Sequence, residues 1–264
     1  MKRPPRALTR GRAPVFPRMA EPRARISRYD AGAMLVLFDV DGTLTRTNGL
    51  DAQLFARAFA DIFGEPLPTT DWTEYRAVTD RGIAEEGALR VLGRRATTAE
   101  VNAMRDRFLV MLEETLGRWS SPLEVPGAAA IVTALREEGR AVAIATGCWE
   151  ASARAKLAAA GIDISGLPLV ASDDEPERER ILGAAIDLVG ATVGRDPIVY
   201  VGDSPWDVTA ARRVGVGFVG VDAEKSGLLA RSGAFDILRD FEDGKAVFSA
   251  LARAHRRVES RSTL

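Results

Sequence analysis

The sequence predicts an α/β fold, a doubly wound parallel sheet that carries a small all-helical cap domain. Two observations support the sheet: short continuous apolar runs recur along the chain, and amphipathic stretches separate them. Such runs are typical of strands buried on both faces of a parallel sheet. A third observation supports the helical part, because residues 51–121 lack these runs and show helical spacing instead.

The strands are predicted from the apolar runs themselves. Three runs are clear and two are weaker: residues 34–38 (MLVLF), 141–145 (AVAIA) and 198–201 (IVYV), then 217–221 and the short 167–171. Proline and glycine mark the helices between them, since proline suits a first helical position and glycine a C-terminal cap. We therefore expect one helix from Pro126 to Gly139 and another that opens at Pro205.

Residues 51–121 are predicted to form the separate cap domain. Thr97 and Glu100 have the spacing of a capping box at the start of a helix. The remaining segments, 31–50 and 122–264, then make up the α/β core domain.

Composition and charge restrict the class of protein. Residues 1–30 hold nine Lys and Arg against two acids, whereas the rest holds 27 basic and 35 acidic side chains. We expect residues 1–30 to be a disordered basic arm, or an extension that precedes a translation start at Met19 or Met34. The alternative is a polybasic arm that binds nucleic acid or anionic lipid. The acidic body gives no reason to expect nucleic-acid binding.

No apolar stretch approaches the about 20 residues of a membrane-spanning helix, so we expect no membrane partner. The single cysteine, Cys148, fits a reducing, cytoplasmic location. No feature of the sequence specifies an oligomeric state.

Polar side chains follow three of the predicted strands. Asp39 and Asp41 come directly after the first, Thr146 after the second, and Asp203 and Asp207 after the third. Sites in open α/β sheets form outside the carboxyl ends of the strands, so these groups should share one crevice. Clustered carboxylates repel one another unless a cation compensates, and Mg²⁺ is the natural choice because it binds carboxylates together with phosphate oxygens.

These segments resemble the signatures of the haloacid dehalogenase superfamily. FDVDGTLT is similar to the first signature, IATG to the second and VYVGDSPWD to the fourth. The resemblance covers residues 33–241 and is closest to phosphatases of the phosphoglycolate type, with a helical cap after the first strand. It implies a Mg²⁺-dependent hydrolase that acts on a small phosphorylated metabolite through an aspartyl-phosphate.

The resemblance also implies roles for individual residues. Asp39 would be the nucleophile, and Asp41 would protonate the leaving alcohol and then deprotonate water. The metal ligands would be the carboxylates of Asp39 and Asp203 and the backbone carbonyl of Asp41, with Asp207 in support.

The phosphoryl oxygens would be bound by Thr146 and Gly147 and by backbone amides after Asp39, including that of Gly42. The third signature departs from the family, which places a lysine or arginine there. Arg178 is the first candidate for this cation and Arg180 the second, since no lysine occurs between Lys156 and Lys225.

Residues 71–82 are expected to be the substrate-facing loop of the cap, through Tyr75, Thr79, Asp80 and Arg81 together with Trp72. The alternative is a connection between helices that packs on its own domain.

Several other functions share this resemblance. Dehalogenation is disfavoured because that subfamily lacks the aspartate at Asp41, and phosphonate cleavage because residues 51–121 contain no lysine. A β-phosphoglucomutase-like phosphotransferase remains an alternative. A non-catalytic binding protein on this scaffold would be expected to lack Asp39, Asp41 or Asp203, and all three are present. A Cys–His mechanism would need His255, from the last helix, to reach Cys148.

Overall fold

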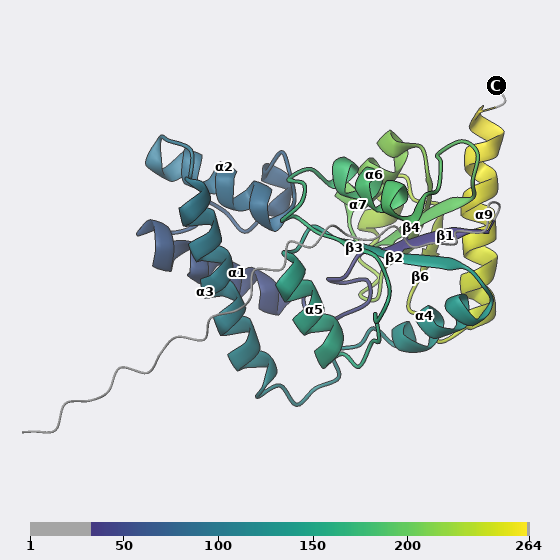
Figure 1. Ribbon diagram of the computed structural model, residues 1–264, viewed down its shortest axis with the longest axis horizontal. Coiled ribbons are helices and arrows are strands. Elements are labelled where there is room, and N and C mark those ends of the chain that lie inside the picture. Colours follow the sequence, from purple (N-terminus) through teal and green to yellow (C-terminus); the bar gives the residue numbers. More distant parts are fainter. Residues whose placement is uncertain (1–32, 263–264) are drawn as a thin grey trace, which may run out of the picture.

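One parallel sheet organises the chain, which the computed structural model describes over residues 33–262 (Figure 1). The predicted basic arm, 1–30, lies outside the described residues. Six strands of the described part form the sheet in the order β3-β2-β1-β4-β5-β6. Their bounds are β1 Leu35–Phe38, β2 Ala141–Ala145, β3 Leu169–Val170, β4 Ile198–Gly202, β5 Gly217–Val221 and β6 Asp236–Leu238. All neighbouring strands pair in parallel, so every carboxyl end faces the same edge.

Helices cover both faces of the sheet, which confirms the doubly wound prediction. Alternate residues of β1 enter different cores: Val36 and Phe38 face one side, Leu35 and Leu37 the other. The first core is shared with α4 (Ala128–Glu137), α5 (Glu150–Ala159) and α9 (Gly244–Ser262). The second is shared with α6 (Arg178–Val189) and α7 (Pro205–Val214), while the short α8 (Leu228–Arg231) precedes β6. Because both faces are buried, the strands need no polar side, and this explains their continuous apolar runs.

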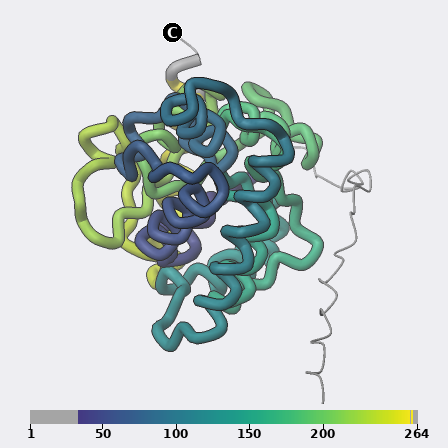
Figure 2. The backbone as a smooth tube through the Cα atoms, turned by 90° about the vertical axis from the view of Figure 1, so that its left-hand side faces the viewer, coloured from purple at the N-terminus to yellow at the C-terminus, as the bar shows by residue number. Residues whose placement is uncertain are grey.

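Helices also fill the segment between β1 and β2. They are α1 (Asn48–Phe63), the 3₁₀ turn η1 (Trp72–Glu74), α2 (Asp80–Leu92) and α3 (Thr98–Leu116). The capping box predicted at Thr97 and Glu100 opens α3. These helices enclose a core of their own, rich in aromatic residues, into which Trp149 of the strand-end loop inserts. Figure 2 looks at the molecule from this side, with the purple and blue helices in front of the sheet.

Two details differ from the sequence prediction. The strand β6 was not predicted, because it is three residues long and lies beside charged residues. The helix expected from Pro126 begins at Ala128 instead, with Gly127 as its N-cap at φ 81°. A side chain at Gly127 would lie 2.6 Å from the carbonyl carbon of Phe241, so the approach of that chain requires glycine here. The helix predicted at Pro205 does begin there.

Within residues 33–262, every helix is too short or too polar to cross a lipid bilayer.

Candidate active site

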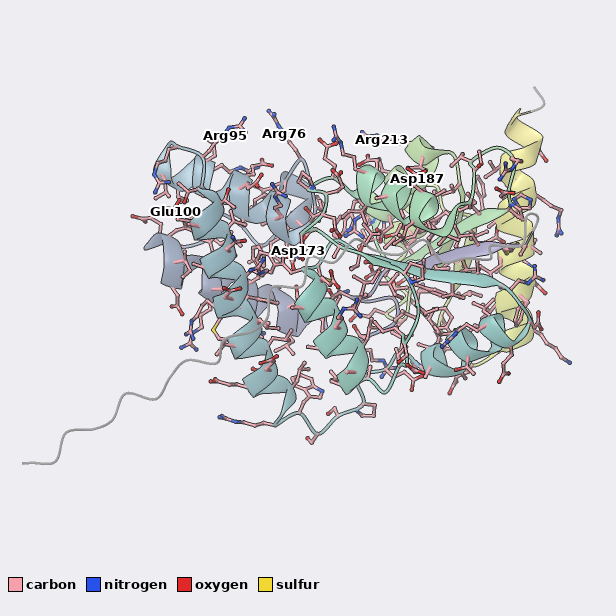
Figure 3. All side chains as sticks on the ribbon, in the orientation of Figure 1. Arg76, Arg95, Glu100, Asp173, Asp187 and Arg213 are labelled. Atoms are coloured by element: carbon pink, nitrogen blue, oxygen red, sulfur yellow. The ribbon has the colours of Figure 1, made fainter. Side chains whose placement is uncertain are left out.

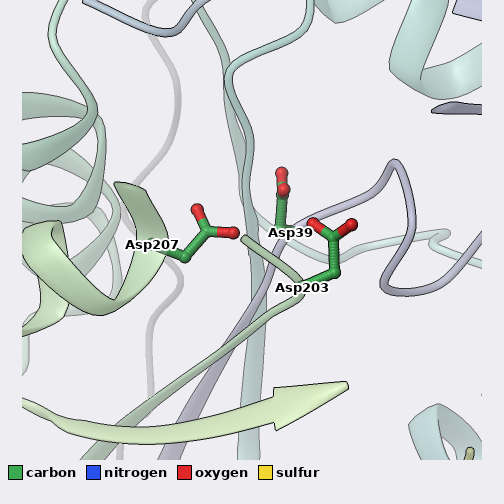
Figure 4. Close-up of side chains that lie close together, drawn as sticks. All are labelled: Asp39, Asp203 and Asp207. Atoms are coloured by element: carbon green, nitrogen blue, oxygen red, sulfur yellow. The ribbon is translucent and has the colours of Figure 1, made fainter. Parts of the chain in front are cut away.

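Three carboxylates meet at the carboxyl edge of the sheet. Asp39 follows β1, Asp203 follows β4, and Asp207 lies in the first turn of α7. Ser204 is the N-cap of α7 and forms a capping box with Asp207, which fixes where that turn begins. One oxygen from each of the three carboxylates lies within 4.8 Å of the others, and Figure 4 shows the side chains converging.

This cluster is electrostatically suited to a cation. Burial, together with the charges of Asp207 and Asp39, raises the pKa of Asp203 well above its usual value. Burial also raises the pKa of Asp207 to about 7, against the opposing effect of Arg178. Burial first, and the repulsion between the carboxylates second, disfavour full ionisation of the cluster, although Arg178 pairs with two of its members. Hard oxygen donors in this spacing fit Mg²⁺, so the residues present agree with the predicted cofactor.

Arg178 lies at this cluster, whereas Arg180 does not. Nη1 of Arg178 is 2.8 Å from Oδ1 of Asp207 and 3.2 Å from Oδ2 of Asp39. It also donates to the hydroxyl of Tyr200 at 3.0 Å. Arg180 is exposed and pairs with Glu175 and Glu177 on the surface. Of the two candidates for the third signature, only Arg178 is in position to contact a phosphoryl group bound beside Asp39.

Two glycines allow the chain to pass this closely. Gly42 has φ 72°, and a side chain there would lie 1.9 Å from a carboxylate oxygen of Asp203. At Gly147 an added Cβ would lie 2.4 Å from Nη2 of Arg178. Any side chain at either position would displace a charged group of the site. Thr146, fully buried at the end of β2, completes this wall, and its Oγ1 accepts from the backbone N–H of Cys148 at 3.3 Å.

Asp41 is not part of the carboxylate cluster and instead forms an ion pair with Lys156. Nζ of Lys156, a fully buried side chain on α5, lies 2.8 Å from Oδ2 of Asp41 and also pairs with Asp51. Cys148 and Thr47 donate hydrogen bonds to the same carboxylate. Burial alone would raise the pKa of Asp41, but Lys156 and these donors outweigh it, and the pKa is lowered.

Lys156 was not predicted as a site residue. The signal for it was present, because Lys156 shares the buried face of α5 with Ala153 and Leu157 at helical spacing. A lysine at such a position must find a buried partner of opposite charge.

Cys148 and His255 do not form a catalytic pair. Burial, and next the Asp41 carboxylate, raise the pKa of Cys148 well above its usual value, so the group remains a thiol. His255 lies on α9 and does not line the cavity at the cluster.

The segment that connects η1 to α2 packs against the strand ends. The N–H of Asp80 donates to the carbonyl of Gly147 at 2.8 Å, and Oγ1 of Thr79 donates to the carbonyl of Pro176 at 2.7 Å. Nη2 of Arg178 donates to the carbonyl of Val78 at 3.1 Å. The same arginine therefore contacts the nucleophile candidate and the helical segment.

Of the residues expected to face a substrate from 71–82, the structure brings Thr79, Asp80 and Trp72 to the cavity. Tyr75 and Arg81 lie outside its lining. Tyr75 is buried within the helical segment, where its hydroxyl donates to the carbonyl of Thr69 at 3.0 Å. Arg81 pairs with Glu85 one turn along α2. On α2, Asp80 and Ile83 line the cavity and Arg81 does not, because residues three apart share a helix face and adjacent residues do not.

A cavity of about 170 Å³ lies between the sheet edge and the helices. Its floor is Asp39, Asp41, Thr146, Gly147, Arg178 and Asp203. A second contact between the helical segment and the α/β core is the ion pair of Arg105 on α3 with Asp173 in the loop after β3, at 3.3 Å; Figure 3 labels Asp173.

A doubly wound sheet with clustered carboxylates at its carboxyl edge defines a class, the open α/β proteins whose functional sites lie outside the strand ends. Comparison with known proteins makes the class specific. The family model for haloacid dehalogenase-like hydrolases matches residues 33–215, and the chain belongs to that family.

Individual relatives agree with this assignment. The chain is 29% identical over 190 residues to a phosphoglycolate phosphatase of Cereibacter sphaeroides, covering 69% of this chain and 82% of the relative. The chain is also 25% identical over 229 residues to the protein SUPPRESSOR OF QUENCHING 1 of Arabidopsis thaliana. That match covers 83% of this chain but 21% of the relative, so this chain spans about a fifth of the relative's length. A crystal structure of a hydrolase from Pseudomonas syringae has the same fold, with a TM-score of 0.63 at 24% identity over 82% of this chain and 98% of that one.

Proposed function

We propose that this hydrolase cleaves a small phosphomonoester in two steps through a phosphoryl group carried on Asp39. The observation that carries the proposal is the convergence of Asp39, Asp203 and Arg178 on one cavity. A nucleophilic carboxylate, a metal-binding carboxylate and a buried cation are the groups that phosphoryl transfer requires. The relative named as a phosphoglycolate phosphatase supports the same reaction class.

In the first step an oxygen of Asp39 attacks phosphorus as the bond from phosphorus to the leaving oxygen breaks. In the second step water attacks the same phosphorus, and the bond to Asp39 breaks. Arg178 donates to the phosphoryl oxygens in both steps, and Thr146 with the amides around Gly42 completes their hydrogen bonds. Bound Mg²⁺, held by Asp39, Asp203 and the carbonyl of Asp41 with Asp207 in support, would neutralise charge on the phosphoryl group.

Asp41 handles the proton in both steps. It protonates the leaving alcohol and then accepts a proton from the attacking water. The pairing with Lys156 lowers the pKa of Asp41 and so favours its ionised form. The proton for the leaving alcohol then enters with the substrate, since the second pKa of a phosphomonoester is about 6.

We propose residues 51–121 as the cap that covers this reaction. The hydrogen bonds of Val78, Thr79 and Asp80 to Pro176, Arg178 and Gly147 support that role, because they hold the helical segment against the strand ends.

The test is phosphate release from p-nitrophenyl phosphate and from a panel of phosphorylated metabolites. Asp39→Asn should release none, because an amide is a poor nucleophile. Asp187→Asn is the matched control, since Asp187 is exposed on the outer side of α6 (Figure 3). Equal activity in Asp39→Asn and Asp187→Asn would refute the proposal. Glucose 1-phosphate separates the mutase alternative, which would form glucose 6-phosphate instead of free phosphate.

A further inference from the structure

The cavity has a second end, which faces away from the carboxylate cluster and must hold the leaving group. Its walls come from α1, η1 and the start of α2. They combine an apolar surface with oxygen acceptors, namely Phe55, Trp72, Val78 and Ile83 with Asp51 and Asp80.

Asp80 directs an open acceptor at this space. The residue is 7% exposed, and its Oδ2 accepts the N–H of Trp149 at 2.9 Å. Among the described residues, no hydrogen bond or ion pair engages Oδ1 of Asp80. Oδ1 is not one of the fully buried polar atoms that lack a partner, and Asp80 lines the cavity, so a ligand or water in the cavity can donate to this oxygen.

Cations are scarce at the same end. Arg178 is the single basic residue among the described residues that line the cavity, and its guanidinium is bound to Asp39, Asp207 and the carbonyl of Val78. Lys156 is fully buried behind the lining, where Asp41 and Asp51 share its charge. Three carboxylates, including Asp80, therefore surround the space with one ammonium group between them.

The titration of Asp80 agrees with this charge count. Burial, and next the Asp51 carboxylate, raise the pKa of Asp80 well above its usual value. A field that disfavours the ionised form of Asp80 disfavours any additional anion beside it.

Resting on the proposed phosphatase function, we infer that the substrate is the phosphomonoester of an uncharged or cationic alcohol. Its leaving group donates from hydroxyl or ammonium groups to Asp80 and Asp51 and packs on Phe55, Trp72 and Ile83. A leaving group with a carboxylate or a second phosphate has no cation to pair with in this cavity. The same reasoning disfavours the mutase alternative, whose bisphosphate intermediate must place a second phosphoryl group at this end.

Three small esters of similar size test this inference: 2-phosphoglycolate, 2-hydroxyethyl phosphate and phosphoethanolamine. They differ chiefly in whether the distal group is a carboxylate, a hydroxyl or an ammonium. We expect kcat/KM for 2-phosphoglycolate to be at least tenfold below the better of the other two. Each ester is also measured as an inhibitor of p-nitrophenyl phosphate hydrolysis, so that the ranking is obtained even for an ester that turns over slowly.

Asp80→Asn connects the ranking to this residue. The amide keeps an oxygen for the N–H of Trp149 but cannot ionise, so the discrimination against 2-phosphoglycolate should shrink at least threefold. Glu85→Gln, on the same helix and outside the cavity, is the control and should leave the ranking unchanged. A wild-type enzyme that hydrolyses or binds 2-phosphoglycolate as well as the other two esters would overturn the inference, whatever the variant does.

The outcomes also separate this inference from the proposed function. Hydrolysis of p-nitrophenyl phosphate with no discrimination against 2-phosphoglycolate overturns the leaving-group inference alone. Failure to hydrolyse p-nitrophenyl phosphate and all three esters overturns the phosphatase proposal, and the inference that rests on it.

Discussion

Arg178→Ala is the substitution whose effect the structure defines in most detail. Nη1 lies 2.8 Å from Asp207 and 3.2 Å from Asp39, so the guanidinium is beside the atom proposed to carry the phosphoryl group. Charge-assisted hydrogen bonds are worth about 1.5–3 kcal/mol. At about 1.4 kcal/mol per tenfold change in rate, kcat/KM should fall by about tenfold to somewhat over a hundredfold.

The same substitution should destabilise the fold, because it leaves two buried carboxylates without their cation. Removing one partner of a buried ion pair costs about 3–5 kcal/mol. The loss should be smaller at pH 6 than at pH 8. Without Arg178 the pKa of Asp207 rises further above about 7, and a carboxyl group with a raised folded-state pKa loses stability as the pH rises.

The assay is steady-state kinetics on one good substrate, with thermal unfolding of each variant at both pH values. Arg178→Lys should recover part of the rate, since it restores a point charge without the planar fork. Arg180→Ala is the matched control and should leave turnover unchanged, because Arg180 is 65% exposed. A loss of kcat/KM in Arg180→Ala without a loss in Arg178→Ala would refute the reasoning. Wild-type kcat/KM in both variants would refute it as well.

Three further predictions concern the proton, the metal and the buried lysine. Asp41→Asn should lose about 10²–10⁴-fold in kcat. Mg²⁺ should still raise the melting temperature of this variant, because the metal contact uses the backbone carbonyl. Loss of that stabilisation by Mg²⁺ would remove Asp41 from the metal site. EDTA should abolish turnover and Mg²⁺ should restore it. The Mg²⁺ affinity measured by calorimetry should rise between pH 6 and pH 8, because Asp207, with a pKa of about 7, must lose its proton to support the metal. A Mg²⁺ affinity that does not change with pH would contradict this. Lys156→Met should lower the melting temperature, because it leaves buried carboxylates without their cation. It should also move the low-pH limb of the kcat profile to higher pH, since Lys156 is the largest of the influences that lower the pKa of Asp41. An unchanged limb would show that Lys156 does not set the pKa of Asp41.

The sequence predicted those parts of the molecule that depend on local pattern. The central strands were predictable because burial on both faces leaves an uninterrupted apolar run, and Asp39, Asp203 and Thr146 followed from their places at strand ends. The strand β6 escaped because three residues beside charges carry no such run.

The parts that depend on tertiary approach were not predictable from the sequence. Arg178 and Arg180 are two residues apart in one helix, and only the packing of α6 on the sheet turns Arg178 toward Asp39. Tyr75 and Arg81 belong to the same polar segment as Thr79 and Asp80, yet of these four residues only Thr79 and Asp80 line the cavity. The pairing of Lys156 with Asp41 joins residues 115 positions apart, so the helical pattern indicates a buried lysine but does not identify its partner.

The central claim is that Asp39 carries the phosphoryl group during turnover, and trapping that intermediate tests it most directly. The enzyme is mixed with p-nitrophenyl phosphate and Mg²⁺, quenched in acid within the first turnovers, and its peptides are analysed by mass spectrometry. The account predicts one added phosphoryl group on the peptide that contains Asp39, removed by hydroxylamine and missing from Asp39→Asn. Turnover at the wild-type rate by Asp39→Asn, or a phosphoryl group trapped on another residue, would contradict it.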